Sequence, residues 1–345
     1  MAEMNAIADV RAIEILDSRG RPTVQTTLRL ASGAVGTVSV PSGASTGTAE
    51  AHELRDGDAG RYGGLGCLQA VAHVNGPIRN LLVTRPVTSQ ADLDAVLNLA
   101  DGTATKSNMG ANAILSVSLA WARAQSVATG IPLYQQFADE IGNGAPTRLP
   151  RPTVNLFSGG KHAGGQMAIQ DVLITPIGTD DAAVAMEQLV AVFNAAARLC
   201  RETYGMRLLV ADEGGLAPAF PSIETAFDDA VRAIEMAGLR PGEDIALCID
   251  VASSHFFDGT AYNLDGAALT AAGMIDRISG WLDRWPIVSV EDGLAEDDWE
   301  HWPALRAAIG DRALVLGDDL TTTNPARIRR AIASKAANAL LLKVN

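Results

Sequence analysis

The chain has 345 residues, of which 48% are hydrophobic, so it can bury a large hydrophobic core. Its length suggests two domains, or one domain plus a large barrel. The formal net charge of −13 argues against nucleic acid and anionic membranes as partners, because both require clustered lysine and arginine. A small anionic substrate is compatible with this charge if a metal supplies local positive charge. The N-terminus carries no secretion signal and no window offers about 18 uncharged apolar residues, so we expect a cytoplasmic protein.

The N-terminal part of the chain predicts a small α+β domain. Residues 5–40 alternate short β-prone runs with glycine-containing turns, which indicates a three-stranded antiparallel meander. The segments ADLDAVLNLA and NAILSVSLAWARAQSVATG then carry apolar residues at helical spacing. The second segment ends at Gly130 with Pro132 just beyond, a normal helix stop.

A stretch rich in glycine and proline, residues 140–152, marks the expected domain boundary. We therefore predict an N-terminal domain of residues 1–140 and a second domain of residues 146–345. In the second domain, helices near 181–203 and 223–238 alternate with the apolar segments DVLITP, IALCID, PIVSVED, ALVLGDD and NALLLKVN. This alternation predicts parallel strands joined by crossover helices.

Four successive predicted strands end in a charged residue: Asp250, Glu291, Asp318 and Lys343. In a (β/α)8 barrel these positions share one rim, where the active sites of such barrels are built. A doubly wound open sheet also gathers its strand ends, so the pattern favours a barrel without excluding the open sheet.

The three acidic strand ends have two interpretations. Converging carboxylates repel one another unless a cation lies between them, and all-oxygen ligands suit Mg²⁺. Alternatively, each acid caps the helix that follows. Lys343, in LLLKVN, has apolar neighbours that favour its neutral form, so it is a candidate base; the alternative is a lysine that extends to solvent. Together these residues indicate a magnesium-dependent enzyme that removes a carbon-bound proton.

Long segments spread over almost the whole chain carry a resemblance to the enolase family. They are LDSRGRPTV, VPSGASTG, ELRDGD, LGANAILSVSLA, GGKHAGG, ADEGGLAP, SVEDGLAEDDW, GDDLTTTNP and ALLLKVN. The resemblance implies an N-terminal α+β domain followed by a (β/α)8-type barrel. It also implies the dehydration of 2-phosphoglycerate to phosphoenolpyruvate in glycolysis, with two Mg²⁺ ions per site.

The resemblance assigns roles to individual positions. Catalytic roles fall on Glu213 as general acid, Lys343 as base and the carboxylate Asp171. The small anionic phospho-substrate is expected to contact five side chains: His162, Gln170, Glu213, Asp318 and Lys343. The metal ligands implied are Asp250, Glu291 and Asp318 for one magnesium and Ser45 for the second. A homodimer or a higher homo-oligomer is also implied.

Several positions near the site depart from the family pattern. Asp171 stands where the family usually carries glutamate, and Ser158, His255 and Gly293 replace the usual residues in their motifs. In a preorganised site, a displacement of about 1 Å can cost roughly a hundredfold in rate. A second function is therefore open: an enolase-like carboxyphosphonoenolpyruvate synthase of phosphonate antibiotic biosynthesis.

The sequence ends at Asn345, directly after the predicted strand that carries Lys343. The resemblance implies two further βα units, so we expect a barrel that is incomplete at its C-terminus. The sequence is then a fragment of a longer product, or a truncated, non-catalytic form that binds metal or a partner.

Overall fold

The computed structural model describes residues 6–43, 47–83, 85–142, 144–207 and 209–344. The chain divides into two compact units. The first consists of the described residues within 6–43 and 50–148, and the second of residues 47–49 and the described residues within 149–344. Each unit has its own hydrophobic core.

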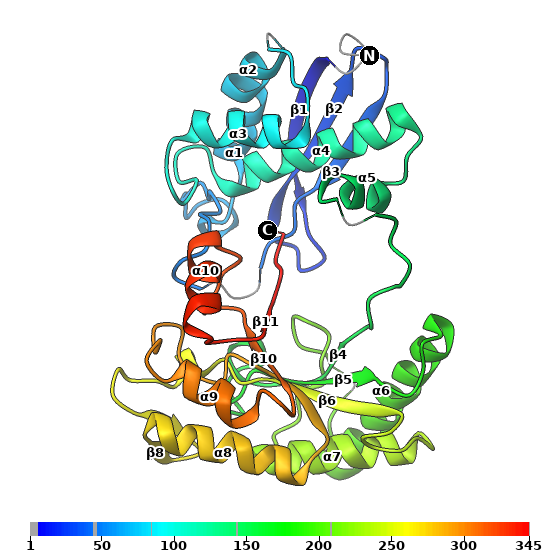
Figure 1. The fold of residues 1–345 in the computed structure, drawn as a ribbon, viewed down its shortest axis with the longest axis vertical. Helices are drawn as coiled ribbons and strands as arrows, with labels where there is room; N and C mark the ends of the chain where they lie inside the picture. The colour runs from blue at the N-terminus through cyan, green and yellow to red at the C-terminus, as the bar shows by residue number, and fades with distance from the viewer. Residues whose placement is uncertain (1–5, 44–46, 84, 143, 208, 345) are drawn as a thin grey trace. The chain divides into compact units, whose positions relative to one another are not determined.

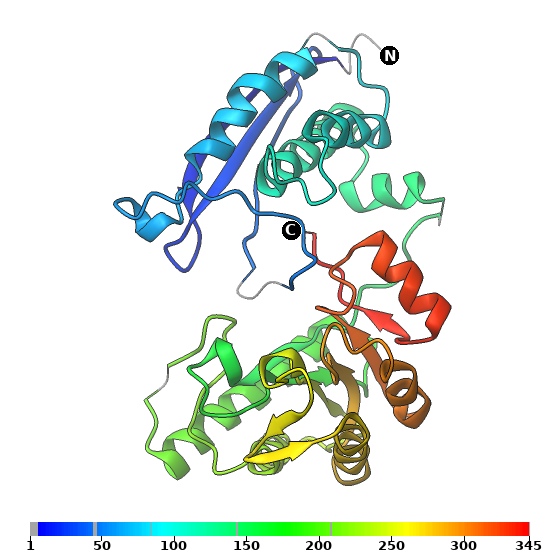
Figure 2. The ribbon, with the colours of Figure 1, turned by 90° about the vertical axis from the view of Figure 1, so that its left-hand side faces the viewer.

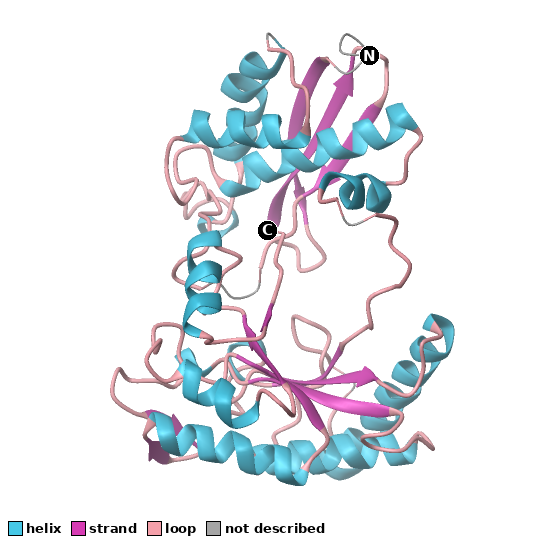
Figure 3. Cartoon of the chain, in the orientation of Figure 1, coloured by secondary structure: helices cyan, strands magenta, loops and turns pink. Residues whose placement is uncertain are grey.

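The first unit combines a three-stranded antiparallel sheet with helices packed on it, as Figures 1 and 3 show. The described strands pair in the order β1-β2-β3, which confirms the predicted meander. Its strands and main helices are β1 (Ile7–Leu16), β2 (Pro22–Leu30), β3 (Val35–Ser39), α1 (Leu68–His73), α2 (Arg79–Val83), α3 (Gln90–Asp101), α4 (Ala111–Thr129) and α5 (Leu133–Glu140).

Helix α4 packs against this sheet through buried side chains of β2 and through a close backbone contact with β3. Val24, Thr26 and Leu28 are fully buried and point to one face of β2, because side chains alternate along a strand. Thr26 Oγ1 lies 2.7 Å from Ser116 Oγ of α4. At Gly36 a Cβ atom would come within 2.1 Å of the Ala120 carbonyl oxygen, so only glycine permits this contact between β3 and α4.

The second unit is an α/β sheet with helices on its outer side (Figures 1 and 3). Among the described residues, six strands pair in the order β11-β10-β9-β6-β5-β4, and β4 and β11 form the two edges, so the barrel is not closed. A small hairpin of β7 and β8, yellow in Figure 2, pairs separately. The elements are β4 (Val154–Ser158), β5 (Asp171–Pro176), α6 (Ala182–Tyr204), α7 (Ile223–Met236), β6 (Ile245–Asp250), β7 (Tyr262–Leu264), β8 (Ala267–Leu269), α8 (Ala271–Arg284), β9 (Ile287–Glu291), α9 (Trp302–Ile309), β10 (Leu314–Gly317), α10 (Pro325–Ser334) and β11 (Ala339–Leu340).

The prediction that all these strands run parallel is wrong at one end of the sheet. β6, β9, β10 and β11 are parallel to one another, but β5 is antiparallel to both β4 and β6. The described residues between β5 and β6 form α6 and α7. One crossover helix returns the chain for a parallel strand, whereas two successive helices bring it back in the opposite direction.

The last strand is also shorter than predicted. NALLLKVN was expected to form a buried strand ending at Lys343, but β11 covers only Ala339–Leu340. Leu342 and Val344 are exposed, and the outer edge of β11 is unpaired among the described residues. An apolar sequence does not by itself bury a strand when no strand pairs with one of its edges.

Helix α6 is long and apolar enough to cross a membrane by length and composition, the one such helix among the described residues, which is weak evidence for a membrane span. Its residues Leu189, Val192, Ala196 and Cys200 form a buried stripe that joins the core of the second unit. We therefore interpret α6 as a packed helix of the α/β unit.

Candidate active site

Strand register brings three acidic side chains to one level of the sheet. Asp171 pairs with Asp250 across β5 and β6, and Asp250 pairs with Glu291 across β6 and β9. Asp171 is the first residue of β5, whereas Asp250 and Glu291 are the last of their strands. The antiparallel direction of β5 therefore places its N-terminal residue at the rim formed by the C-terminal ends of the parallel strands.

Asp318 follows β10 directly and joins the same rim. Leu316 of β10 pairs with Glu291, and the amide of Asp292 donates to the Leu316 carbonyl. Asp318 therefore lies just beyond the level of Glu291. Its Oδ2 lies 2.7 Å from Nζ of Lys343. The rim thus carries the predicted acids in strand order and a lysine at their end.

Burial and mutual repulsion disfavour ionisation along this row. Burial, with the charges of Asp171 and Asp318, raises the pKa of Asp250 to about 8. Burial and the charges of Asp250 and Asp292 raise the pKa of Glu291 well above its ordinary value, and Lys343 opposes this shift. The pKa of Asp318 is also raised, by burial, against the effect of Lys343. Such a row favours a cation, because only added positive charge permits all these groups to ionise.

The oxygens of this row suit a divalent metal. Asp250 accepts from Nε2 of Gln170 at 2.8 Å and from the amide of Ala252 at 3.0 Å. Asp318 Oδ1 is buried and has no hydrogen-bond partner among the described residues. An all-oxygen donor set with an unsatisfied buried carboxylate oxygen fits Mg²⁺.

The structure does not gather the three predicted metal ligands tightly. Within the described residues, Asp250, Glu291 and Asp318 are not among the sets of three side chains whose donor atoms all lie within 4.8 Å of one another. The ion pair to Lys343 occupies one oxygen of Asp318. Ser45, the predicted ligand of a second magnesium, lies outside the described residues.

Asp292 is a site residue to which the sequence analysis gave no role. It is fully buried, and its two carboxylate oxygens accept from the amides of Asp318 at 3.1 Å and Asp319 at 2.7 Å. Its φ of +42° is unusual for a residue with a side chain. Asp292 therefore ties the end of β9 to the turn that carries Asp318. An acid directly after a predicted ligand was the available signal.

A second group lies next to the first, around Asp171. Asp171 accepts from Ser158 Oγ at 2.6 Å and from His162 Nδ1 at 2.8 Å. The other ring nitrogen, Nε2 of His162, lies 3.6 Å from Glu213 Oε1. One potential metal-ligand atom from each of His162, Asp171 and Glu213 lies within 4.8 Å of the other two. The structure thus brings together three residues that the resemblance assigned to catalysis and substrate contact.

The charges in this second group are linked. Burial opposes protonation of His162, but its hydrogen bond to Asp171 and the nearby charges raise its pKa above the ordinary value. Burial also raises the pKa of Asp171, against the hydrogen bonds from His162 and Ser158. Glu213 accepts from Nδ2 of Asn155 at 3.2 Å, and its side chain is 44% exposed. Glu213 is therefore the member of the group that faces solvent.

The sequence matches two domain descriptions over almost its whole length. Residues 7–137 match "Enolase, N-terminal domain", and residues 146–345 match "Enolase, C-terminal TIM barrel domain". The chain belongs to the enolase family. The family assignment makes this a lyase-type protein of the enolase superfamily with soluble domains. The family is generally metal-dependent, in agreement with the acidic groups on the rim.

Lys343 lies in a more open setting than the sequence predicted. Its side chain is 22% exposed and follows β11 by three residues. The amide of Lys343 donates to Thr323 Oγ1 at 3.1 Å, which connects the lysine to the turn after β10. The ion pair to Asp318 and the hydrogen bond to Thr323 thus both connect Lys343 to the segment after β10.

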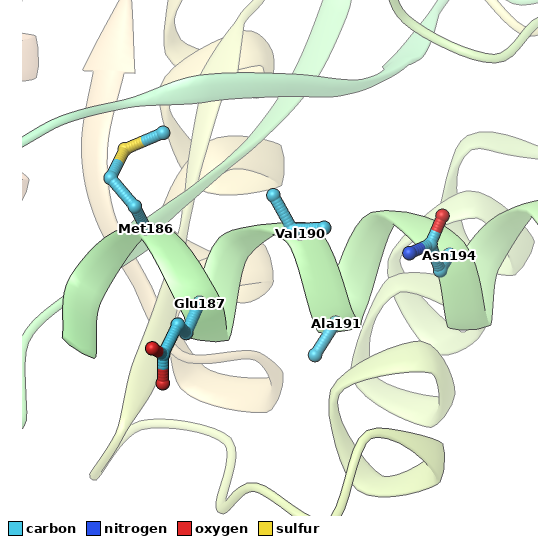
Figure 4. A pocket seen from close by; sticks show the side chains of 5 residues that line it. All are labelled: Met186, Glu187, Val190, Ala191 and Asn194. Atoms are coloured by element: carbon cyan, nitrogen blue, oxygen red, sulfur yellow. The ribbon is translucent and has the colours of Figure 1, made fainter. Parts of the chain in front are cut away.

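A pocket on the outer face of α6 is separate from this rim. It is lined by Met186, Glu187, Val190, Ala191 and Asn194, whose side chains Figure 4 shows along the helix. No predicted site residue lines it.

Proposed function

We propose that this member of the enolase family dehydrates 2-phosphoglycerate to phosphoenolpyruvate in a magnesium-dependent reaction. The observation that carries the proposal is the row of buried carboxylates that ends at Lys343, with Asp318 Oδ2 2.7 Å from its Nζ. Neutralising the row would need a cation, and the lysine at the end of the row supports a role in taking a proton from carbon.

In this proposal Lys343 removes the C2 proton of the substrate. The C2–H bond breaks, the proton moves to Nζ, and the electron pair enters the adjacent carboxylate group. Asp250, Glu291 and Asp318 would hold one Mg²⁺ and Ser45 would contribute to a second. The bound ions would supply positive charge beside the substrate carboxylate, which lowers the cost of the added negative charge.

Glu213 then acts as the general acid for loss of the C3 hydroxyl. The C3–O bond breaks, Glu213 provides the proton that makes the leaving group water, and the C2–C3 double bond forms. Its exposed carboxyl group faces solvent, where a substrate enters. Nδ2 of Asn155 donates a hydrogen bond to it, and the space beside Gly214 is open.

A second candidate function is supported by the contact between two positions that depart from the family pattern. Ser158 donates to Asp171 at 2.6 Å, so a short hydroxyl group and a short carboxylate replace longer side chains as a pair. The second candidate is therefore carboxyphosphonoenolpyruvate synthesis, in which a carboxyphosphonate group replaces the phosphate.

Exchange of the C2 proton tests the first step of the proposal. We expect 2-phosphoglycerate to incorporate deuterium at C2 when it is incubated with the protein and Mg²⁺ in deuterium oxide. Nuclear magnetic resonance measures this incorporation. Lys343→Ala should lose the exchange, and Lys335→Ala, on the exposed end of α10, should keep it. Exchange that persists in Lys343→Ala would remove Lys343 as the base. A protein that reacts with the phosphonate substrate but not with 2-phosphoglycerate would favour the second candidate.

A further inference from the structure

The loop after β6 carries polar side chains to which the proposed reaction gives no role. Ser253 Oγ and Nδ1 of His255 are buried, and neither has a hydrogen-bond partner among the described residues. Buried polar groups in native proteins nearly always have a partner in the protein, in ordered water or in a ligand. His255 is also one of the positions that depart from the family pattern. The loop therefore holds hydrogen-bonding capacity that is available to a bound molecule.

Hydrogen bonds from two sides fix this loop at the rim. The amide of Ser253 donates to the carbonyl of Asp292, which follows β9, at 3.1 Å. The amide of Glu296 donates to Ser254 Oγ at 2.9 Å. Because the residues directly before it are held in this way, His255 has a defined position beside the acidic rim.

The loop after β4 places two basic side chains next to His255. Burial and the charges of Lys161 and His162 lower the pKa of His255 to about 4, so these two side chains lie near its ring. Strand register explains the proximity, because the last residues of β4 and β6 both pair with Asp171, the first residue of β5. A neutral imidazole keeps one N–H group. His255 is therefore a hydrogen-bond donor at neutral pH.

Lys161 carries the uncompensated charge of this group. His162 lies between two carboxylates, with Nδ1 2.8 Å from Asp171 and Nε2 3.6 Å from Glu213. Lys161 is exposed and has no ion pair among the described residues. A lysine without a carboxylate partner, next to an imidazole that can donate, suits an anion whose oxygens accept hydrogen bonds.

We propose that Lys161 and His255 form a subsite for the phosphate or phosphonate group of the substrate. Lys161 supplies the positive charge, His255 donates a hydrogen bond, and both lie beside His162. The inference rests on the proposed function, because it requires a substrate with such a group at the rim. Both candidate substrates carry one, so the subsite serves either of them.

Phosphate binding tests the subsite without turnover. Inorganic phosphate is added to the full-length protein, and the imidazole resonance of His255, assigned with His255→Gln, is followed by nuclear magnetic resonance. We expect this resonance to shift and the pKa of His255 to rise, because an anion favours the imidazolium form. The half-saturating phosphate concentration should rise about fivefold in Lys161→Gln. It should not change in Lys335→Gln, the matched control at an exposed position.

Two results of this titration would overturn the subsite. One is a His255 resonance that phosphate does not move. The other is the same phosphate affinity in the wild type and in Lys161→Gln.

Steady-state kinetics tests the role of the subsite in the reaction. We expect His255→Ala and Lys161→Gln each to raise KM about fivefold to tenfold for the substrate that the wild type converts, with little change in kcat. His255→Asn keeps an N–H donor and should retain most of the affinity. A lower kcat with unchanged KM would contradict a binding role. If the wild type converts neither substrate, the proposed function fails, and the phosphate titration alone then decides whether the subsite exists.

Discussion

Replacing Asp250 with asparagine is expected to stabilise the metal-free protein while abolishing its activity. Asp250 is buried in the middle of the carboxylate row, and its pKa is raised to about 8. Asparagine removes the charge and keeps an oxygen for the Ala252 amide. Gln170 can rotate to present Oε1, which has no hydrogen-bond partner among the described residues. The substitution therefore leaves each hydrogen bond of Asp250 replaceable.

The size of the effect follows from the pKa. In the unfolded chain the carboxyl group has its ordinary pKa of 3.8, and the folded value is higher, so the folded state binds the proton more tightly. The stability contributed by Asp250 is fully present below pH 3.8 and is lost as the pH rises towards 8. At pH 7 the loss is about 4 kcal/mol, from 1.36 kcal/mol per pKa unit. Allowing for relaxation of the neighbours, we expect Asp250→Asn to gain about 2–4 kcal/mol there.

Urea denaturation with a chelator present, at pH 5, 6, 7 and 8, measures the free energy of unfolding of the wild type and the variant directly. The wild type should lose stability with rising pH, and Asp250→Asn should lose less, because burial still raises the pKa values of Glu291 and Asp318 in the variant. Asp180→Asn, at an exposed position, should follow the wild type. Adding Mg²⁺ should stabilise the wild type and leave Asp250→Asn unchanged. A variant that is less stable than wild type at pH 7 would refute the electrostatic reasoning.

Two further substitutions separate the parts of the site. Gly215→Ala would place a Cβ atom 2.3 Å from Ser158 Oγ and displace the loop that carries Glu213, so we expect kcat to fall about a hundredfold. Adding Ser158→Ala should restore part of it, and wild-type turnover in the single variant would contradict the assignment of this loop. Lys343→Met should lower turnover by about a thousandfold and retain magnesium binding in calorimetry. Parallel loss of both would show that Lys343 supports the metal site instead of acting as the base.

Local sequence patterns predicted the helices and strands well, but they contained little information on whether neighbouring strands run parallel or antiparallel. The alternation in β2 places Val24 and Leu28 on one face, and the helix stop at Gly130 is the C-cap of α4, with φ of +70°. The apolar run of β5 is compatible with either direction. The antiparallel pairing of Asp171 with Asp250 followed from two successive helices, which the sequence had already indicated.

The acidic rim was predictable because its residues end successive strands, whereas its supporting contacts were not. Asp292 follows a predicted ligand and resembles an ordinary loop acid, yet its carboxylate holds two amides of the next turn. The contact of Thr48 with Glu296 joins residues far apart in sequence, and no local pattern indicates it. Exposure of Lys343 depends on which strands lie beside β11, which its apolar neighbours do not determine.

Formation of phosphoenolpyruvate tests the central claim most directly. The wild-type chain is incubated with 2-phosphoglycerate, with Mg²⁺ or with a chelator, and the product is followed by its ultraviolet absorbance. We expect phosphoenolpyruvate in the presence of Mg²⁺, none with the chelator, and none for Lys343→Met. Magnesium binding without any product at saturating Mg²⁺ and substrate would contradict the proposed reaction.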